Sequence, residues 1–177
     1  MSLASELGLE KPFEDLRHET MLNVVHTANL LAAVGTVFFR QFDLTEAQFN
    51  VLFALKYKMG NLTQSGLGKR LVVTRASITS ILDKLEEKEL VVRENVPDNR
   101  RIYHVALTPE GQRLVDHVEP FYRQEIYRTF EGLTDKECKH LIQILERVRA
   151  RAVVRKASEF ANKHRLALGA NQLDTEL

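Results

Sequence analysis

The chain has 177 residues, 44% of them hydrophobic and 28% charged, which is typical of a folded globular protein and excludes disorder along its whole length. Lys and Arg number 25 against 24 Asp and Glu, so the net charge of +1 provides no overall field to attract nucleic acid. One cysteine permits no intramolecular disulfide, and we find neither a signal-peptide pattern nor an apolar run near about 18 residues. We therefore expect a cytoplasmic protein with no membrane partner.

Threonine residues mark the expected helix starts. Each one directly precedes a helical pattern and can accept a hydrogen bond from the unpaired amides of a first turn: Thr45, Thr63, Thr74, Thr108 and Thr134. After a first long helix over about 13–40, they predict helices over about 45–58, 63–71 and 74–88, one from 108 that Pro120 should kink, and one over about 134–164. The chain is thus expected to be mainly α.

A β-hairpin is predicted directly after the fourth of these helices. Residues 90–95 and 102–107 are rich in β-branched and aromatic side chains, and a Pro-Asp-Asn turn separates them. Two short helices followed by a hairpin form the outline of a winged helix-turn-helix with a two-stranded wing. The expected regions are an N-terminal helix in 1–40, the winged domain in 41–108, C-terminal helices in 109–168 and a flexible tail in 169–177.

The helix over 74–88 has the properties of a helix that enters the major groove of DNA. Ile78, Ile81, Leu82 and Leu85 recur at helical spacing and must face the core. The rest of its first two turns is small, hydroxylated or basic and can approach base edges and phosphates, while the acids come later. The candidate DNA-binding residues here are Thr74, Arg75, Ala76, Ser77, Thr79 and Ser80. The alternative is an ordinary amphipathic helix with a solvated face.

The tip of the hairpin carries the second candidate DNA contact. Arg100 and Arg101 stand on a narrow protrusion that suits the minor groove, where negative potential is concentrated. Asp98 would oppose DNA by its own charge, so we expect it to hold the arginines in position through a charge-assisted hydrogen bond. The alternative is a charged turn that only keeps the hairpin soluble.

The segment from Leu62 to Gly111, ending in DNRRIYHVALTPEG, resembles the MarR family of bacterial transcriptional regulators. A weaker likeness extends over 13–155 and includes LTDKECKHLIQILERV, which is similar to the family's last helix. The resemblance implies a homodimer whose N- and C-terminal helices interlock, with two winged domains on a pseudo-palindromic operator in double-stranded DNA, repressing transcription by blocking it. It also implies Thr74–Ser80 as the segment that reads DNA and Asp98 and Arg100 as wing residues. Val72 and Glu89 stand where the family often has glycine.

The resemblance further implies control by a signal, and three kinds are open. A small anionic aromatic effector would bind between the first helix and the winged domain, at a site lined by His18, Met21, Leu22 and Val25. A redox signal would need an accessible thiolate, whereas Cys138 is in line with an apolar helix face and is expected in a core. Of the six histidines, those at 18, 26, 104 and 117 match no compact ligand spacing, so we expect no metal and no cofactor.

Catalysis finds no support, because the chain has no Gly-rich phosphate loop, metal-hydrolase motif or nucleophile elbow, and we expect no enzyme. Residues 139–165 hold eight bases and two acids, which favours a solvated helix face, with phosphate contact as the alternative. Two rival functions stay open. One is a helical ligand- or protein-interaction module that has lost DNA binding, and the other is a metal- or redox-sensing regulator.

Overall fold

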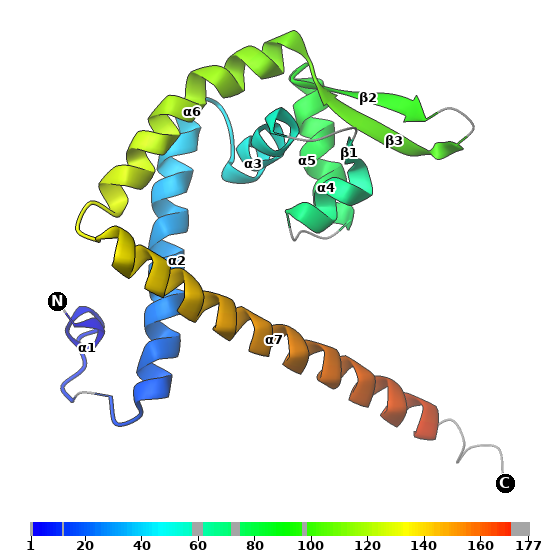
Figure 1. The fold of residues 1–177 in the computed structure, drawn as a ribbon. Helices are drawn as coiled ribbons and strands as arrows, with labels where there is room; N and C mark the ends of the chain where they lie inside the picture. Colours follow the sequence, from blue (N-terminus) through cyan, green and yellow to red (C-terminus); the bar gives the residue numbers. More distant parts are fainter. Residues whose placement is uncertain (1, 12, 58–61, 72–74, 97–98, 171–177) are drawn as a thin grey trace, which may run out of the picture. The chain divides into compact units, whose positions relative to one another are not determined.

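The computed structural model describes residues 2–11, 13–57, 62–71, 75–96 and 99–170, and for residues 75, 96, 99–102 and 156–170 it describes the backbone only. The elements run in the order α1 (Leu3–Glu6), α2 (Leu16–Arg40), α3 (Glu46–Lys56), β1 (Leu62–Thr63), α4 (Gln64–Arg70), α5 (Arg75–Glu87), β2 (Val91–Val96), β3 (Asn99–Leu107), α6 (Pro109–Thr129) and α7 (Asp135–Ala170) (Figure 1). Two compact units divide the chain, Met1–Tyr122 and Arg123–Leu177, and each is described by itself. We call the part of the first unit from α3 to β3 the winged domain.

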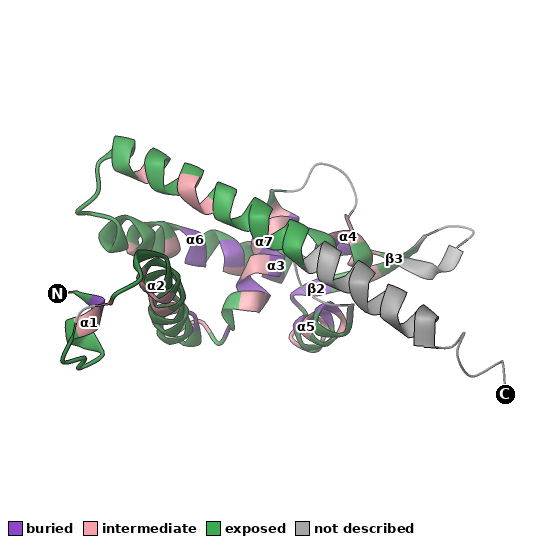
Figure 2. Ribbon diagram, turned by 90° about the horizontal axis from the view of Figure 1, so that it is seen from below, coloured by how far each residue is buried: buried purple, intermediate pink, exposed green. Residues whose placement is uncertain are grey.

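Helix α2 begins at Leu16, three residues later than predicted, because Asp15 is its N-cap. The Asp15 carboxylate accepts a hydrogen bond of 2.8 Å from the backbone N–H of Arg17. Of the 25 residues of this helix only Phe39 is buried, and Figure 2 shows α2 exposed along almost its whole length. The short helix α1 before it was not predicted from the sequence.

The expectation that no apolar stretch approaches membrane-spanning length is wrong for α2. By length and composition this helix would suffice to cross a membrane, and only 6% of its apolar stretch is buried. Asn23, His26 and Asn29 interrupt the apolar run, but no Asp, Glu, Lys or Arg stands between Thr20 and Phe39, which is why a search for consecutive apolar residues missed it. Length and composition alone do not distinguish such a span from a helix whose apolar sides are covered by protein.

The hydrophobic core lies inside the first unit and is built from the end of α2, from α3, α4, α5, α6 and from the sheet. The rings of Phe39 and Phe49 have centroids 4.8 Å apart, and Tyr122 of α6 lies edge-on to Phe49 at 5.0 Å. The other fully buried side chains are Val51, Leu52, Leu67, Ile78, Leu82, Leu85, Val105, Val115 and Val118. Figure 2 shows buried residues on α3 and α6, in contrast to α2.

Threonine caps fix the starts of α3 and α4. Thr45 caps α3 in a complete capping box: Gln48 N donates to Thr45 Oγ1 at 3.2 Å, and Thr45 N donates to Gln48 Oε1 at 2.9 Å. Thr63 caps α4 by accepting from Gly66 N at 3.1 Å. Both predicted starts are confirmed within one residue, whereas the predicted cap of α5, Thr74, lies outside the described residues.

The wing belongs to a three-stranded antiparallel sheet with the order β1-β3-β2, rather than to a two-stranded hairpin alone. β2 pairs with β3 from Val91 opposite Leu107 onward, with an irregularity after Asn95. β1 adds Leu62 opposite Val105 on the other edge of β3. A strand of two residues is too short to show an alternating pattern, so the sequence could not predict it.

Thr108 joins the end of α5, the base of the wing and the start of α6. Its hydroxyl donates to the carbonyl oxygen of Glu89 at 2.6 Å and accepts from Gly111 N at 3.0 Å, while Thr108 N donates to Leu90 O at 3.2 Å. Glu89 has a φ of 56°, the left-handed conformation that glycine adopts most easily. A Cβ atom on Gly111 would lie 2.0 Å from Leu90 O, so this close approach of two backbones requires glycine.

The second unit holds the end of α6 and all of α7. Thr134 and Glu137 form the predicted capping box: Thr134 N donates to Glu137 Oε2 at 2.8 Å, and Glu137 N donates to Thr134 Oγ1 at 3.3 Å. Hydrogen bonds from the hydroxyl and the amide of Thr134 lower the pKa of Glu137. The helix runs to Ala170, beyond the predicted end near 164. The predicted class, mainly α with a winged helix-turn-helix, is confirmed.

Candidate nucleic-acid interface

Helix α5 presents the two faces that its sequence predicts. Ile78 and Leu82 on the inner side are no more than 1% exposed. Ala76, Ser77 and Ser80 on the other side are exposed. Small exposed side chains in the first turns allow the backbone of a helix to approach base edges and phosphates closely. The described part of this surface therefore has the shape that insertion into a major groove requires.

Thr79 joins the two helices of the helix-turn-helix. Its hydroxyl accepts a hydrogen bond of 2.6 Å from Nε2 of Gln64, the first residue of α4, and its side chain is half-buried. This bond fixes the N-terminal half of α5 against α4. The sequence analysis placed Thr79 among the DNA contacts and did not identify Gln64, because the two residues lie 15 positions apart.

Arg93 on β2 is the main residue of this surface that the sequence analysis missed. Its Nη2 lies 2.6 Å from Oδ1 of Asp83 and its Nη1 lies 2.6 Å from Oε2 of Glu86, both on α5. Nη2 also donates to the carbonyl oxygen of Thr79 at 3.4 Å, and the Arg93 side chain is only 17% exposed. One guanidinium therefore joins the wing to the recognition helix and offsets two carboxylates that would repel DNA phosphates.

A signal for Arg93 was present in the sequence. Side chains alternate between the two faces of a strand, so Arg93 shares a face with Val91, which is buried. A cation on the inner face of a strand needs an acidic partner. Asp83 and Glu86 on the preceding helix are the acids that the chain brings next to it.

The remaining predicted DNA contacts are described in part. Thr74 and Asp98 lie outside the described residues, and only the backbone is described for Arg75, Arg100 and Arg101. Arg75 is the first residue of α5, and β3 begins at Asn99, so both wing arginines belong to the strand rather than to the turn. Figure 1 shows the β2–β3 hairpin extending away from α4 and α5. The predicted contacts of these side chains with DNA stay predictions.

Comparison with known proteins decides the family. The model of the MarR family matches residues 44–103. The chain is 30% identical over 112 residues to YsmB of Bacillus subtilis strain 168, described as an uncharacterized HTH-type transcriptional regulator, and the match covers 63% of this chain and 76% of YsmB. The chain belongs to the MarR family. MhqR, an HTH-type transcriptional regulator of the same organism, is 31% identical over 105 residues, covering 59% of this chain and 72% of MhqR.

A solved structure of this family has the same fold. BpsR of Bordetella bronchiseptica is 28% identical, and the comparison covers 71% of this chain and 98% of BpsR with a TM-score of 0.60. The structure in question concerns regulation of the DNA binding of BpsR by 6-hydroxynicotinic acid. This MarR-family chain is therefore a DNA-binding transcriptional regulator and not an enzyme.

The four predicted effector residues of the MarR-family chain lie along one side of α2. Met21 and Val25 are 61% and 42% exposed, His18 is exposed, and Leu22 is half-buried. Successive residues of a helix are 100° apart, which places His18, Leu22 and Val25 within one narrow sector and Met21 at its edge. The ring of His18 lies edge-on to Phe13 with centroids 5.9 Å apart. An effector at this face stays a prediction.

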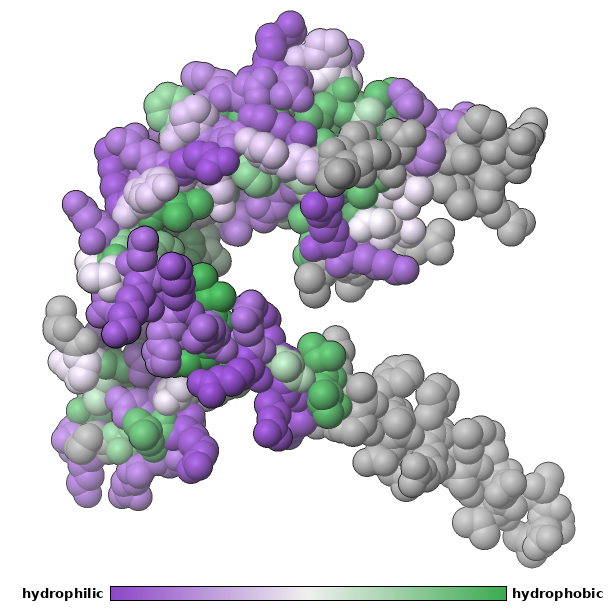
Figure 3. All heavy atoms as spheres, in the orientation of Figure 1, coloured by the Kyte–Doolittle hydropathy of each residue, from purple (hydrophilic) through white to green (hydrophobic). Residues whose placement is uncertain are grey.

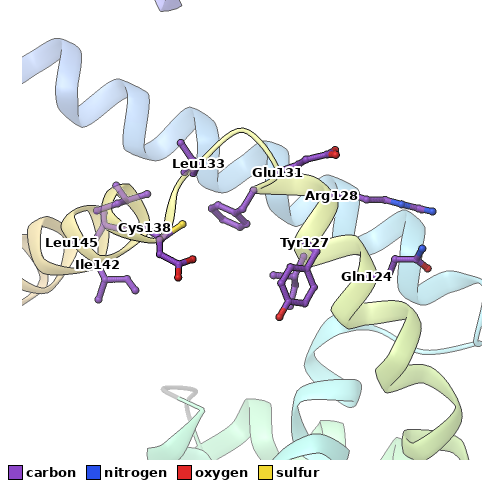
Figure 4. A pocket seen from close by; sticks show the side chains of 12 residues that line it. Gln124, Tyr127, Arg128, Glu131, Leu133, Cys138, Ile142 and Leu145 are labelled. Atoms are coloured by element: carbon purple, nitrogen blue, oxygen red, sulfur yellow. The ribbon is translucent and has the colours of Figure 1, made fainter.

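A hollow lies wholly in the second unit of the regulator, between the end of α6 and the start of α7, with a volume of about 780 Å³. Figure 4 shows Leu133, Cys138, Ile142 and Leu145 on the α7 side and Gln124, Tyr127, Arg128 and Glu131 on the α6 side. Cys138 is half-buried at the wall of this hollow rather than enclosed in a core. Within the described residues, no group of three or more His, Cys, Asp or Glu is arranged to hold a metal ion.

Proposed function

We propose that this MarR-family regulator acts in the cytoplasm as a homodimer that binds a pseudo-palindromic operator and represses transcription, and that a small-molecule effector releases it. The observation that carries the proposal is the exposed, small and hydroxylated face of α5, with the acids Asp83 and Glu86 both paired with Arg93. Repression is the simplest consequence of a protein that occupies an operator and blocks access to it.

The exposed apolar side chains of the long helices support a homodimer. On α2, Leu30, Val34 and Val37 are 53%, 52% and 66% exposed. Val153 and Val154 on α7 are each 67% exposed, and Figure 3 shows hydrophobic atoms at the surface near the end of the described side chains of this helix. Soluble monomers rarely expose apolar faces of this extent, and a second copy of the same chain would cover them symmetrically.

Selection from random duplexes tests the DNA-binding proposal. The purified protein should enrich an inverted repeat whose half-sites lie about one DNA turn apart, roughly 34 Å. Absence of any enrichment at low salt would contradict the proposal and favour a helical interaction module that has lost DNA binding.

Arg100→Ala tests the wing. We expect it to weaken operator binding strongly and to reduce the slope of log affinity against log salt by about 1.8 in the dimer, because two phosphate contacts are lost. Arg113→Ala is the matched control, since Arg113 is an exposed arginine on α6 that pairs with Glu110. An unchanged slope for Arg100→Ala would show that Arg100 makes no phosphate contact and would contradict the proposed role of the wing.

The effector proposal is supported by the exposed face of α2 and by the behaviour that the BpsR structure describes for that protein. Benzoate and 6-hydroxynicotinate serve as anionic aromatic probes, added to the protein bound to its selected operator. We expect one of them to release the DNA, and we expect Val25→Ala to change the concentration required without changing affinity for DNA in its absence. Release that is equally sensitive in the variant would place the effector elsewhere.

A further inference from the structure

A cluster of charged and polar side chains joins the end of α3 to α6 inside the first unit. Lys56 Nζ lies 2.6 Å from Asp116 Oδ1 and 2.5 Å from Glu119 Oε2. Tyr57 donates its hydroxyl to the other oxygen of Glu119, also at 2.5 Å. We call Lys56, Tyr57, Asp116 and Glu119 the α3–α6 clamp. None of the four belongs to the exposed face of α5 or to the predicted effector residues.

Burial of the Glu119 carboxylate makes the geometry of the α3–α6 clamp costly to change. Glu119 is only 6% exposed, and a carboxylate is costly to bury unless it is paired and hydrogen-bonded, as both of its oxygens are here. Hydrogen bonds to Asp116 and Glu119 raise the pKa of Lys56, and hydrogen bonds from Lys56 and Gln112 lower the pKa of Asp116. The Lys56 ammonium and the Asp116 carboxylate therefore stay charged at neutral pH. Any shift of α6 along α3 would separate these atoms and leave a buried charge without its partner.

The clamp lies at a weak point of α6. Pro120 directly follows Glu119, and a proline donates no backbone hydrogen bond, so the carbonyl of Asp116 lacks its usual helical partner. The first unit ends two residues later, at Tyr122. The backbone around Pro120 thus resists bending less than an ordinary helix does. The side-chain contacts near Pro120 must therefore set the direction of α6.

We propose that the α3–α6 clamp is a positioning device that fixes the direction in which α6 leaves the winged domain, and thereby the half-site spacing that the dimer accepts on DNA. The inference rests on the proposed dimeric regulator. Two recognition helices must lie about 34 Å apart to enter successive major grooves on one side of the duplex. Because α6 runs on past Pro120, a small change of its direction there moves each winged domain along the DNA axis.

The test compares duplexes that contain the selected operator with its half-sites at the preferred spacing, one base pair closer and one base pair farther apart. The variants are Glu119→Gln, which removes the buried charge, and Tyr57→Phe, which removes one hydroxyl from a residue that is 48% exposed. We expect discrimination between spacings to fall at least about fivefold in both. Affinity for a duplex with a single half-site should stay within about twofold of the unaltered protein.

Two controls separate positioning from a loss of folding. Glu110→Gln makes the same chemical change on the same helix, at an exposed residue that pairs with Arg113, and should leave discrimination unchanged. Lys56→Arg keeps a cation between Asp116 and Glu119 and should retain most of the discrimination. Hydrogen exchange of the α6 amides near Pro120 should accelerate in Glu119→Gln and not in Glu110→Gln.

The outcomes are distinct. Lost discrimination with preserved half-site binding supports the clamp as a positioning device. Unchanged discrimination, or an equal loss of affinity for every duplex including the half-site, overturns it. If the unaltered protein binds no duplex at low salt, the proposed function is wrong, and the positioning role that depends on it is wrong as well.

Discussion

The winged domain and the long helices α2 and α7 bury their apolar side chains to very different extents. The hydrophobic core cluster runs from Phe39 to Val118 and contains residues that are almost fully inaccessible. In α2 only Phe39 is buried, and no residue of α7 up to Arg155 is buried among those whose side chains are described. The first unit therefore contains its own hydrophobic core, to which the winged domain, the end of α2 and the start of α6 all contribute. The long helices instead present exposed apolar side chains, which we expect a second chain to cover.

The largest expected effect disrupts the first unit where α6 packs against the base of the wing. Gly111→Ala would place a Cβ atom 2.0 Å from the carbonyl oxygen of Leu90, so the backbones of α6 and the wing base must separate. We expect the free energy of unfolding to fall by about 3 kcal/mol or more, measured by urea denaturation. Gly132→Ala is the control, because nothing lies within 4 Å of a Cβ atom at Gly132. Equal stability of the two variants would contradict the close approach at Thr108.

The second prediction concerns the exposed apolar face of α2. Val34→Glu places a charge on the exposed apolar face of α2 and should raise the dissociation constant of the dimer by about two orders of magnitude or more. The winged domain should keep its fold, because Val34 is outside the core cluster. Analytical ultracentrifugation measures the dissociation, and Asn29→Glu, at an exposed polar position on the opposite side of α2, serves as the control. A variant that stays dimeric would place the interface elsewhere.

A smaller effect is expected at the join between wing and recognition helix. Arg93→Ala leaves the carboxylates of Asp83 and Glu86 without their shared cation, next to the turns of α5 that we propose to face DNA. Operator affinity should fall about tenfold, measured by fluorescence anisotropy, while the dimer stays intact. Combining the change with Asp83→Asn and Glu86→Gln should recover much of the loss, because the unpaired charges are then gone. No recovery would mean that Arg93 acts on DNA in another way.

The smallest expected effect is a gain in the stability of the winged domain. Glu89, two residues after the end of α5, has a φ of 56°, so Glu89→Gly should relieve backbone strain and stabilise the winged domain by about 0.5–1 kcal/mol in thermal or urea unfolding. Asp43 also has a positive φ, of 52°, but its carboxylate accepts from Lys88 Nζ at 2.7 Å. Asp43→Gly therefore removes a contact together with the strain and should bring no comparable gain. A destabilised Glu89→Gly variant would contradict this account of the helix end.

The sequence predicted the features that depend on near neighbours. The capping boxes of Thr45 and Thr134 each involve a residue three positions away, and the apolar spacing in α5 placed Ile78 and Leu82 correctly in the core. Local hydrogen bonds and helical periodicity are fixed by the chain itself, so a sequence pattern reveals them.

The features that were missed depend on distant neighbours or on very short segments. Arg93 reaches back to α5, Gln64 binds Thr79 across the turn, and Lys56 binds Glu119 from 63 positions away. Such pairs form only after tertiary packing has brought the elements together, and many acids and bases along the chain were equally possible partners. The exposure of α2 was missed for a related reason. Apolar residues at helical spacing predict that one face of a helix is covered, but they do not show whether the same chain or another chain covers it.

The junction at Thr108 couples the end of α5 to the wing and to α6, which affects how an effector could change DNA binding. The side chain and the amide of Thr108 hold the residues that follow α5, the base of the wing and the first turn of α6 together, and a Cβ atom at Gly111 would collide with Leu90. We therefore expect α5 to move together with the wing and the start of α6. An effector that releases DNA would then act by shifting these elements as one body rather than by turning α5 alone.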